Sequence, residues 1–309
     1  MYKAIALALA ASGCTATSSL CQRLGVGRAQ PDGFDPGLLF RLARHPVWLA
    51  GIASMIAGFA FQVTALRFGP LALVQPILAL ELPLVFGYLA LLGSQRVRPR
   101  DWLAACAMSA GLGLFLLAAA PSGGRLHAPA GLWWLAGLAS ASAVLLALAV
   151  ALGLGRRAAV PASRRAAVLG IAAGLAWGFE AAVIKEFSSH LGGGAGAVFG
   201  NWSVYVLIGA GAASLLLASH ALAAGPLAAS QPGFTIIDPL AASLLGVFLF
   251  GERMQAGMAD LAGEAAGLAL LVTGVSVLSH SHLIHAEDGL AKAARPAPRE
   301  ASESAPARR

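Results

Sequence analysis

Two acidic residues lie deep inside apolar stretches of this sequence, each just before a proline. Glu81 precedes Pro83 by two residues, and Asp238 directly precedes Pro239. A charged side chain inside a membrane span costs roughly 2.5 to 3.5 kcal/mol on insertion scales, so it persists where something requires it. A proline also frees the backbone carbonyl one turn earlier in its helix. Carboxylate and carbonyl oxygens are ligands for hard cations, so this pattern favours a cation site that both segments share, with Glu81 and Asp238 as candidate metal ligands.

Three amide side chains are further candidates for the same site. Gln75 and Gln231 each directly precede a proline, Pro76 and Pro232, and their amide oxygens could complete a cation site. Asn201 begins an apolar stretch in company with aromatic residues, where it could line a cavity. The alternative role for the glutamines is hydrogen bonding between packed helices. The alternative for the Asn201 region is an aromatic belt at the membrane surface.

Glu180 follows a stripe of glycines at 170, 174 and 178, which share one face of a helix. Small residues allow a neighbouring helix to approach closely. We therefore expect Glu180 to lie at a helix contact, where it could line a cavity or form an ion pair with Lys185. Lys185 itself is expected at the membrane interface, near the end of the span.

The composition indicates a chain that faces lipid. Hydrophobic residues make up 58% of the 309 residues, charged residues 11%, and the mean hydropathy is +0.75. Soluble domains carry about 25% charged residues, so this chain could not cover a soluble surface. The net charge of +7 arises from basic residues between apolar stretches, which is typical of topology determinants. We expect the lipid bilayer as the partner and no nucleic acid.

About nine apolar stretches have the length that a transmembrane helix needs, and we predict an all-α, polytopic membrane protein. Sixteen of the 21 Lys and Arg residues fall on one side if the N-terminus is outside and the C-terminus cytoplasmic, as expected for a cell-membrane protein. The expected units are residues 1–120 with four helices, 131–280 with five, and a disordered tail at 281–309. The expected spans are 3–21, 46–66, 70–93, 101–120, 131–153, 166–187, 197–218, 225–250 and 261–280.

An internal repeat relates the two halves. Residues 66–83 and 222–239 align without a gap at an offset of 156, and eight of the 18 positions are identical. The matches include a Gly-Pro pair, a Gln-Pro pair and a third proline. The loop charges give the two copies opposite orientations in the membrane. An inverted repeat of this kind is typical of transporters that alternate the access to one central site.

The sequence resembles a known group of transporters. The Gly-Pro-Leu-Ala hairpin, the proline in mid-helix and the exit Leu-Phe-Gly-Glu-Arg at 249–253 resemble the drug/metabolite transporter (EamA-like) superfamily. The four-plus-five layout, with Trp48-Leu49-Ala50-Gly51 opening the second span, is similar to the NIPA-like magnesium transporter family. The first repeat departs from the family pattern, because Gln95-Arg96 stands at the exit where Glu-Arg is usual. The resemblance implies transport, with magnesium as the implied substrate.

These observations predict a secondary transporter of a small solute or ion, with a divalent cation such as Mg²⁺ as the first substrate. A proton-coupled exporter of an organic metabolite or drug is the alternative, in which the same acids would carry H⁺. No nucleophile-base set, phosphate-binding loop or HExxH motif is visible, so we expect no enzyme and no resident cofactor. A membrane scaffold would not need acids buried in both halves, and an intramembrane enzyme would need a nucleophile-base set. A homodimer stays open, since the small-residue stripes could pack within or between chains.

Overall fold

The structure is a computed structural model that describes the chain except residues 30–43, 45, 92–97, 156–161, 225–226 and 281–309. The described residues are almost entirely helical, and two short strands, β1 (Ser122–Gly123) and β2 (Glu252–Arg253), pair antiparallel. The helices are α1 (Tyr2–Ala29), α3 (Pro46–Phe68), α4 (Leu71–Leu78), α5 (Glu81–Leu91), α6 (Pro99–Ala119), α7 (Ala130–Gly155), α8 (Ala162–His190), η1 (Leu191–Gly193), α9 (Gly194–Phe199), α10 (Trp202–Ala224), α11 (Leu227–Pro232), η2 (Gly233–Ile237), α12 (Asp238–Phe250) and α13 (Met258–Ser279).

The prediction of an all-α, multi-pass membrane protein is confirmed. Within the described residues, eight helices are long and apolar enough to cross a membrane. The remaining expected span, 70–93, is broken into the two shorter helices α4 and α5. The expected span 225–250 is also interrupted, because the five-residue π-helix η2 separates α11 from α12. Each interruption lies about one turn before a proline, Pro83 in the first span and Pro239 in the second.

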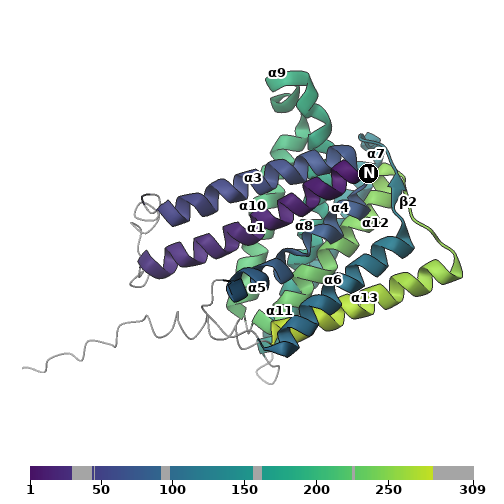
Figure 1. Ribbon diagram of the computed structural model, residues 1–309. Coiled ribbons are helices and arrows are strands. Elements are labelled where there is room, and N and C mark those ends of the chain that lie inside the picture. The colour runs from purple at the N-terminus through teal and green to yellow at the C-terminus, as the bar shows by residue number, and fades with distance from the viewer. Residues whose placement is uncertain (30–43, 45, 92–97, 156–161, 225–226, 281–309) are drawn as a thin grey trace, which may run out of the picture.

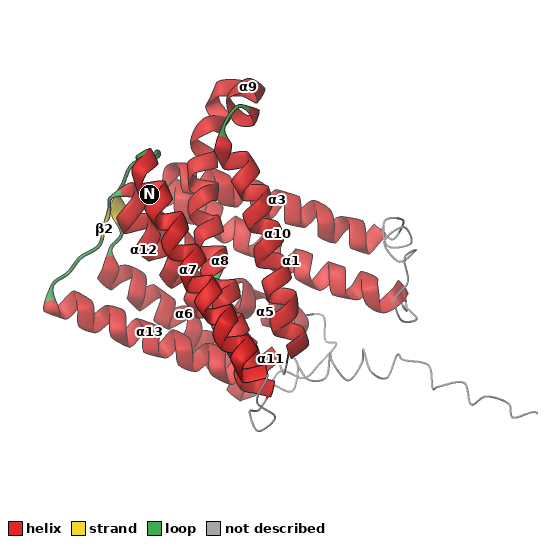
Figure 2. Cartoon of the chain, turned by 180° about the vertical axis from the view of Figure 1, so that it is seen from behind, coloured by secondary structure: helices red, strands yellow, loops and turns green. Residues whose placement is uncertain are grey.

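Helix α8 runs through the middle of the molecule. In its most apolar stretch 56% of the residues are buried, whereas the corresponding value for α7, which lies on the outside, is 11%. Around α8 the helices pack largely in pairs: α1 lies along α3, α6 along α13, and α10 along α8 (Figures 1 and 2). The largest buried apolar cluster joins α1, α4, α8 and α12, so the two interrupted spans lie within the core.

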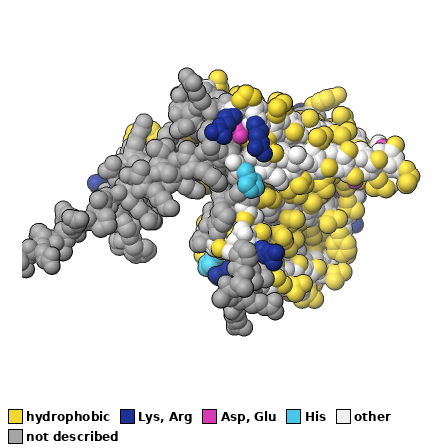
Figure 3. Space-filling model, turned by 90° about the horizontal axis from the view of Figure 1, so that it is seen from below, with side chains coloured by type: hydrophobic (Ala, Val, Ile, Leu, Met, Phe, Trp, Pro, Cys, Tyr) yellow, Lys and Arg dark blue, Asp and Glu magenta, His cyan; other side chains and the backbone are white. Residues whose placement is uncertain are grey.

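The outer surface of the helices is apolar, as expected for contact with lipid. Large side chains such as Trp134, Leu117 and Leu244 are more than two-thirds exposed on their helices. In the view from below, hydrophobic side chains cover much of the described surface, and a few Lys and Arg side chains gather toward one part of it (Figure 3). Soluble proteins rarely expose so much contiguous apolar surface.

The helix bounds bear on the two predicted units. Helix α10 has the bounds of α3 shifted by 156 residues, and α11 begins 156 residues after α4. The pairing of α1 with α3 also corresponds to that of α8 with α10. The inverted repeat and the units 1–120 and 131–280 stay predictions that these bounds support. The tail at 281–309 lies outside the described residues.

Candidate functional site

The first interruption lies between α4 and α5 and is produced by Pro83. Because Pro83 has no N–H, the carbonyl of Ala79 lacks its partner one turn on, and it accepts the N–H of Leu82 instead, at 3.4 Å. The carbonyl of Leu78 is also left free by the tightened turn. The hydroxyl of Ser12 on α1 donates to it at 3.5 Å. A neighbouring helix thus supplies a partner for the opened backbone, as a break inside a membrane requires.

The second interruption is the π-helix η2, and it stands in the same relation to Pro239. One turn before Pro239 the chain widens to the π-form over Gly233–Ile237, and the α-helix resumes at Asp238. Single π-turns inside helices are frequent at functional sites. Pro83 and Pro239 are the aligned prolines of the sequence repeat, so an interruption of the helix precedes each of the two aligned prolines.

The two interruptions lie beside each other because α4 and α12 run antiparallel. A Cβ built on Gly246 of α12 would lie 3.2 Å from the Cβ of Leu71, at the start of α4. Pro76 and Pro239, farther toward the interruptions, line one cavity. The eight residues of α4 span about 12 Å. That is close to half of the roughly 30 Å hydrocarbon core, so both breaks lie near the midplane if α4 begins at the membrane surface.

A small apolar cavity lies between the interruptions. Both broken helices contribute to it, and α6 and α13 close it on the other side. Its lining contains no charged side chain, and its volume of about 20 Å³ has room for about one water molecule. The lining residues are Pro76, Phe115, Ile236, Pro239, Leu240, Leu268 and Leu271.

Two buried polar atoms at the interruptions have no hydrogen-bond partner. Gln75 on α4 is 3% exposed, and its side-chain nitrogen is unpartnered. Asp238, the first residue of α12, has an unpartnered buried carboxylate oxygen, Oδ1. Buried polar groups are nearly always satisfied in native proteins, so such exceptions point to a ligand, an ion or water. Each broken helix contributes one of the two.

The predicted acids have partners on different helices. Glu81, at the start of α5, accepts a hydrogen bond from the hydroxyl of Ser19 on α1 at 2.7 Å. Glu180 on α8 accepts one from Ser214 on α10 at 2.6 Å. Asp238 lies against the same part of α8, because a Cβ built on Gly178 would be 3.0 Å from the carbonyl oxygen of Asp238. The structure therefore places Asp238 near the turn of α8 that carries Glu180, while the metal site shared by Glu81 and Asp238 stays a prediction.

The remaining predicted site residues are Asn201, Pro232 and Gln231, and the structure does not bring them to one place. The side chain of Asn201 accepts the N–H of Ser203 at 2.8 Å, so it caps the first turn of α10 at the end of the molecule where α8 also ends. Pro232 is the last residue of α11. Gln231 precedes it in α11, and its side chain lies outside the part of the chain that the structure describes.

The expectation that Lys185 pairs with Glu180 is wrong, and its place near the membrane interface stays a prediction. Its side chain is 2% exposed, and its ammonium group bonds to Glu252 of β2 and lies 4.7 Å from the ring centroid of Phe250. Glu252 also accepts the first two N–H groups of α4, those of Leu71 at 2.5 Å and Ala72 at 2.9 Å. The glutamate of the Phe-Gly-Glu-Arg exit thus caps the broken helix of the other half. The sequence contained both motifs, but nothing in it linked them.

Comparisons with known proteins add one relative. No protein-family model matches the chain, and no solved structure matches it. The chain is similar to an uncharacterized protein of Corynebacterium glutamicum, with 29% identity over 238 residues that cover 76% of this chain and 79% of that protein. The likeness therefore extends over most of both chains and is not confined to one motif. Functional inference for this chain rests on its own residues.

Proposed function

We propose that the protein is a secondary membrane transporter with one central site between the two broken helices. The observation that carries the proposal is the pair of interruptions, each with a buried and unpartnered polar atom, on Gln75 and Asp238. Transporters of inverted-repeat architecture bind substrate and coupling ions where discontinuous helices meet at the midplane. A scaffold needs no such opened backbone, and a catalytic mechanism has no support in these residues.

The first substrate we propose is a divalent cation such as Mg²⁺. The polar groups at the interruptions offer oxygen atoms, which hard cations prefer: the carboxylates of Glu81, Asp238 and Glu180, and the amide of Gln75. Because Glu81 and Asp238 lie on separate helices with separate neighbours, we infer that a movement of one broken helix toward the other would complete the ion site. The resemblance to magnesium transporters favours the same choice.

The second candidate is a proton-coupled exporter of a small organic solute, and the apolar cavity favours it. The cavity is lined by proline, leucine, isoleucine and phenylalanine side chains but holds only about one water molecule, so an organic group would enter it when the broken helices move apart. In this case Asp238 and Glu180, which lie on contacting helices, would take up and release the coupling proton. Intramembrane acids commonly serve as proton relays in transporters. For either substrate we propose a cell-membrane location with the N-terminus outside and the C-terminus cytoplasmic.

Thermal stability of the purified chain in detergent tests the proposal. A ligand that binds only the folded state stabilises it by about 2.7 kcal/mol at 100 times its dissociation constant. Saturable stabilisation by Mg²⁺, stronger than by Ca²⁺ or Na⁺ and lost in Glu81→Gln/Asp238→Asn, supports the cation carrier. A midpoint that depends on pH and loses this dependence in the same double variant supports the proton-coupled exporter.

A matched control separates the central acids from acids in general. Asp260 caps the first turn of α13 by accepting the N–H of Gly257 at 3.2 Å, away from both interruptions. Asp260→Asn removes one acid as Asp238→Asn does, and it should leave the response to Mg²⁺ or pH unchanged. If the double variant at Glu81 and Asp238 responds to every solute and to pH as the parent does, the central-site mechanism is wrong.

A further inference from the structure

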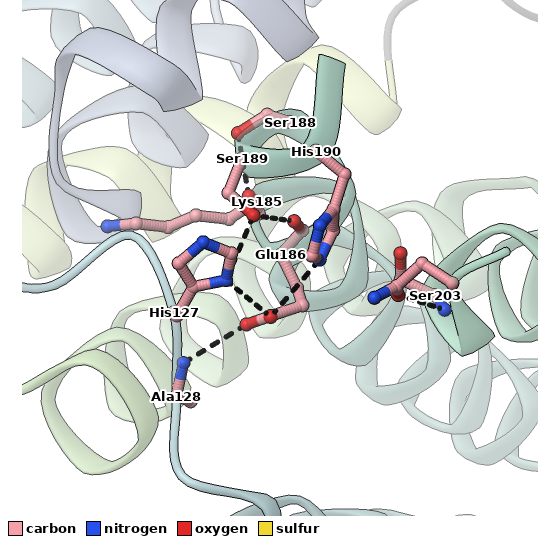
Figure 4. Close-up of polar contacts among 9 residues, drawn as sticks. His127, Ala128, Lys185, Glu186, Ser188, Ser189, His190 and Ser203 are labelled. Carbon is pink, nitrogen blue, oxygen red and sulfur yellow. Dashed lines mark hydrogen bonds and ion pairs between the residues drawn. The ribbon is translucent and has the colours of Figure 1, made fainter. Parts of the chain in front are cut away.

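A second cluster of ligand-type side chains lies far from the interruptions, at the end of the molecule where β1 pairs with β2. Glu186 and His190 belong to the last turns of α8, one helical turn apart, so their side chains share a face. His127 comes from the segment between β1 and α7 and faces them (Figure 4). Among the described residues these three form a group whose potential metal-ligating atoms all lie within 4.8 Å of one another.

The separations in this cluster match those of a small metal site. His127 Nδ1 lies 3.0 Å from Glu186 Oε1, and His190 Nε2 lies 3.7 Å from the same oxygen. Zinc binds imidazole nitrogen and carboxylate oxygen at about 2.0 to 2.2 Å in tetrahedral geometry, which places neighbouring ligand atoms about 3.3 Å apart. The two imidazole rings stand at 58° with centroids 4.9 Å apart, so one ion could reach a nitrogen of each.

The carboxylate at the centre is held in place and lacks a full counter-charge. The side chain of Glu186 is 6% exposed, and its second oxygen, Oε2, accepts the backbone N–H of Ala128 at 3.1 Å. This second contact orients the carboxylate as outer partners do for metal ligands. The buried Nε2 of His190 has no hydrogen-bond partner. Ser189 adds a hydroxyl 3.1 Å from Nδ1 of His127. Buried charges are normally paired or bound to a metal, and the ion-pair partners of Glu186 within the described residues are the two titratable imidazoles.

We propose that His127, Glu186 and His190 bind a transition-metal ion of the zinc class, with a fourth position open to water. Two imidazoles and one carboxylate favour Zn²⁺ and similar ions over Mg²⁺, which prefers oxygen ligands and keeps its waters. The bound ion would join the segment before α7 to the end of α8. This site is separate from the central site and from the ion or solute proposed for transport.

The simpler alternative is a hydrogen-bonded His–Glu contact without an ion. It explains the 3.0 Å distance between His127 and Glu186, since a protonated imidazole would donate to the carboxylate. It leaves the buried nitrogen of His190 without a partner, whereas an ion would engage all three side chains. The two arrangements differ in one measurable property, which is the affinity for Zn²⁺.

Zinc titration of the full-length protein in detergent, against a chromogenic chelator, tests the proposal. Because His280, His282 and His285 could bind zinc by themselves, the parent for the test carries alanine at all three positions. We expect this parent to bind one Zn²⁺ per chain and Mg²⁺ far more weakly. His127→Ala, whose side chain is 57% exposed and so tolerates change, and His190→Ala should each weaken zinc binding at least about tenfold.

A matched control and a spectroscopic readout make the test decisive. His220 on α10 is exposed, and its ring lies 2.8 Å from a carbonyl of its own helix, so His220→Ala should bind zinc as the parent does. Replacement of Zn²⁺ by Co²⁺ should give the intense visible absorption of a four-coordinate site, and Glu186→Gln should weaken or shift it. A parent that binds no zinc, or variants that bind it equally well, would overturn the proposal. No transport assay is involved, so failure here leaves the proposed function untouched.

Discussion

The two broken helices are interrupted just before the aligned prolines Pro83 and Pro239, yet different contacts hold them in place. Helix α4 is fixed at its start by charge, because Glu252 accepts its first two N–H groups and bonds to the buried Lys185. The α11–η2–α12 segment is instead fixed along its length by close backbone packing. A Cβ on Gly174 would overlap the carbonyl oxygen of Gly233, and one on Gly178 would lie 2.6 Å from the Cβ of Ala241.

The difference shows that the second half of the molecule supports both broken helices. The charges that hold α4 come from Glu252, at the exit of α12, and from Lys185 on α8, and both lie in the second half. A helix start with a buried carboxylate is electrostatically favourable, because the N-terminus of a helix carries partial positive charge. The glycine stripe of α8 lets a widened π-turn lie directly on its backbone.

Loss of the charge anchor should give the largest effect. Lys185→Met leaves the buried carboxylate of Glu252 without its ammonium partner, and breaking a buried ion pair costs about 3 to 5 kcal/mol. We expect the free energy of unfolding, measured by detergent or denaturant titration, to fall by about that amount.

The combined variant and a surface control sharpen this expectation. Lys185→Met with Glu252→Gln removes both charges, and it should be more stable than Lys185→Met alone because no unpaired buried charge remains. Arg253, the exposed neighbour of Glu252 in β2, serves as the control, and Arg253→Gln should change stability by less than about 0.5 kcal/mol. Equal losses for Lys185→Met and Arg253→Gln would show that charge does not anchor α4.

Disruption of the close packing between Gly174 of α8 and the π-helix η2 should have the second-largest effect on stability. Gly174→Ala places a methyl group against the backbone of η2, and overpacking of this kind costs about 1 to 3 kcal/mol. Gly209→Ala on α10 is the matched control, since a Cβ there meets nothing within 4 Å and alanine favours a helix. If both variants unfold alike, the π-turn is not held by its contact with α8.

The features of the fold that could be predicted from the sequence are those that local periodicity encodes. The glycine spacing, the apolar stretches and the aligned prolines are local patterns, so they indicated a helix contact near Glu180 and a freed carbonyl before each proline. They did not predict that the spans 70–93 and 225–250 are interrupted. The pairing of Lys185 with Glu252, and the cap on α4, join residues 67 and 181 positions apart. Such contacts depend on how the helices assemble, which no single apolar stretch encodes. The cluster of His127, Glu186 and His190 was missed for the same reason.

Neutralising Asp238 separates a binding role from a packing role. Asp238→Asn keeps the shape of the side chain but removes a charge whose buried Oδ1 has no partner, so stability should be unchanged or slightly raised. Transport of the solute that stabilises the protein in the thermal titration should fall at least about tenfold, equivalent to about 1.4 kcal/mol. Uptake into proteoliposomes, measured together with unfolding, checks both expectations. Transport at the parent rate in Asp238→Asn would contradict a binding role for this residue.

Glu81→Gln differs from Asp238→Asn because it also weakens the hydrogen bond from Ser19, so it should lower both stability and transport.

Asn201 gives the smallest expected effect, and it tests whether a predicted site residue is instead a helix cap. Asn201→Ala removes the acceptor for the N–H of Ser203, and loss of an N-cap typically costs about 1 kcal/mol. Asn201→Ser should restore most of that stability, because serine caps helices nearly as well. Neither variant should alter the response to Mg²⁺ or pH, because Asn201 caps α10 at the end of the molecule where α8 ends. This position is away from the two interruptions. A lost ligand response in Asn201→Ser, with stability intact, would return Asn201 to the binding site and extend that site from the interruptions to the end of α8.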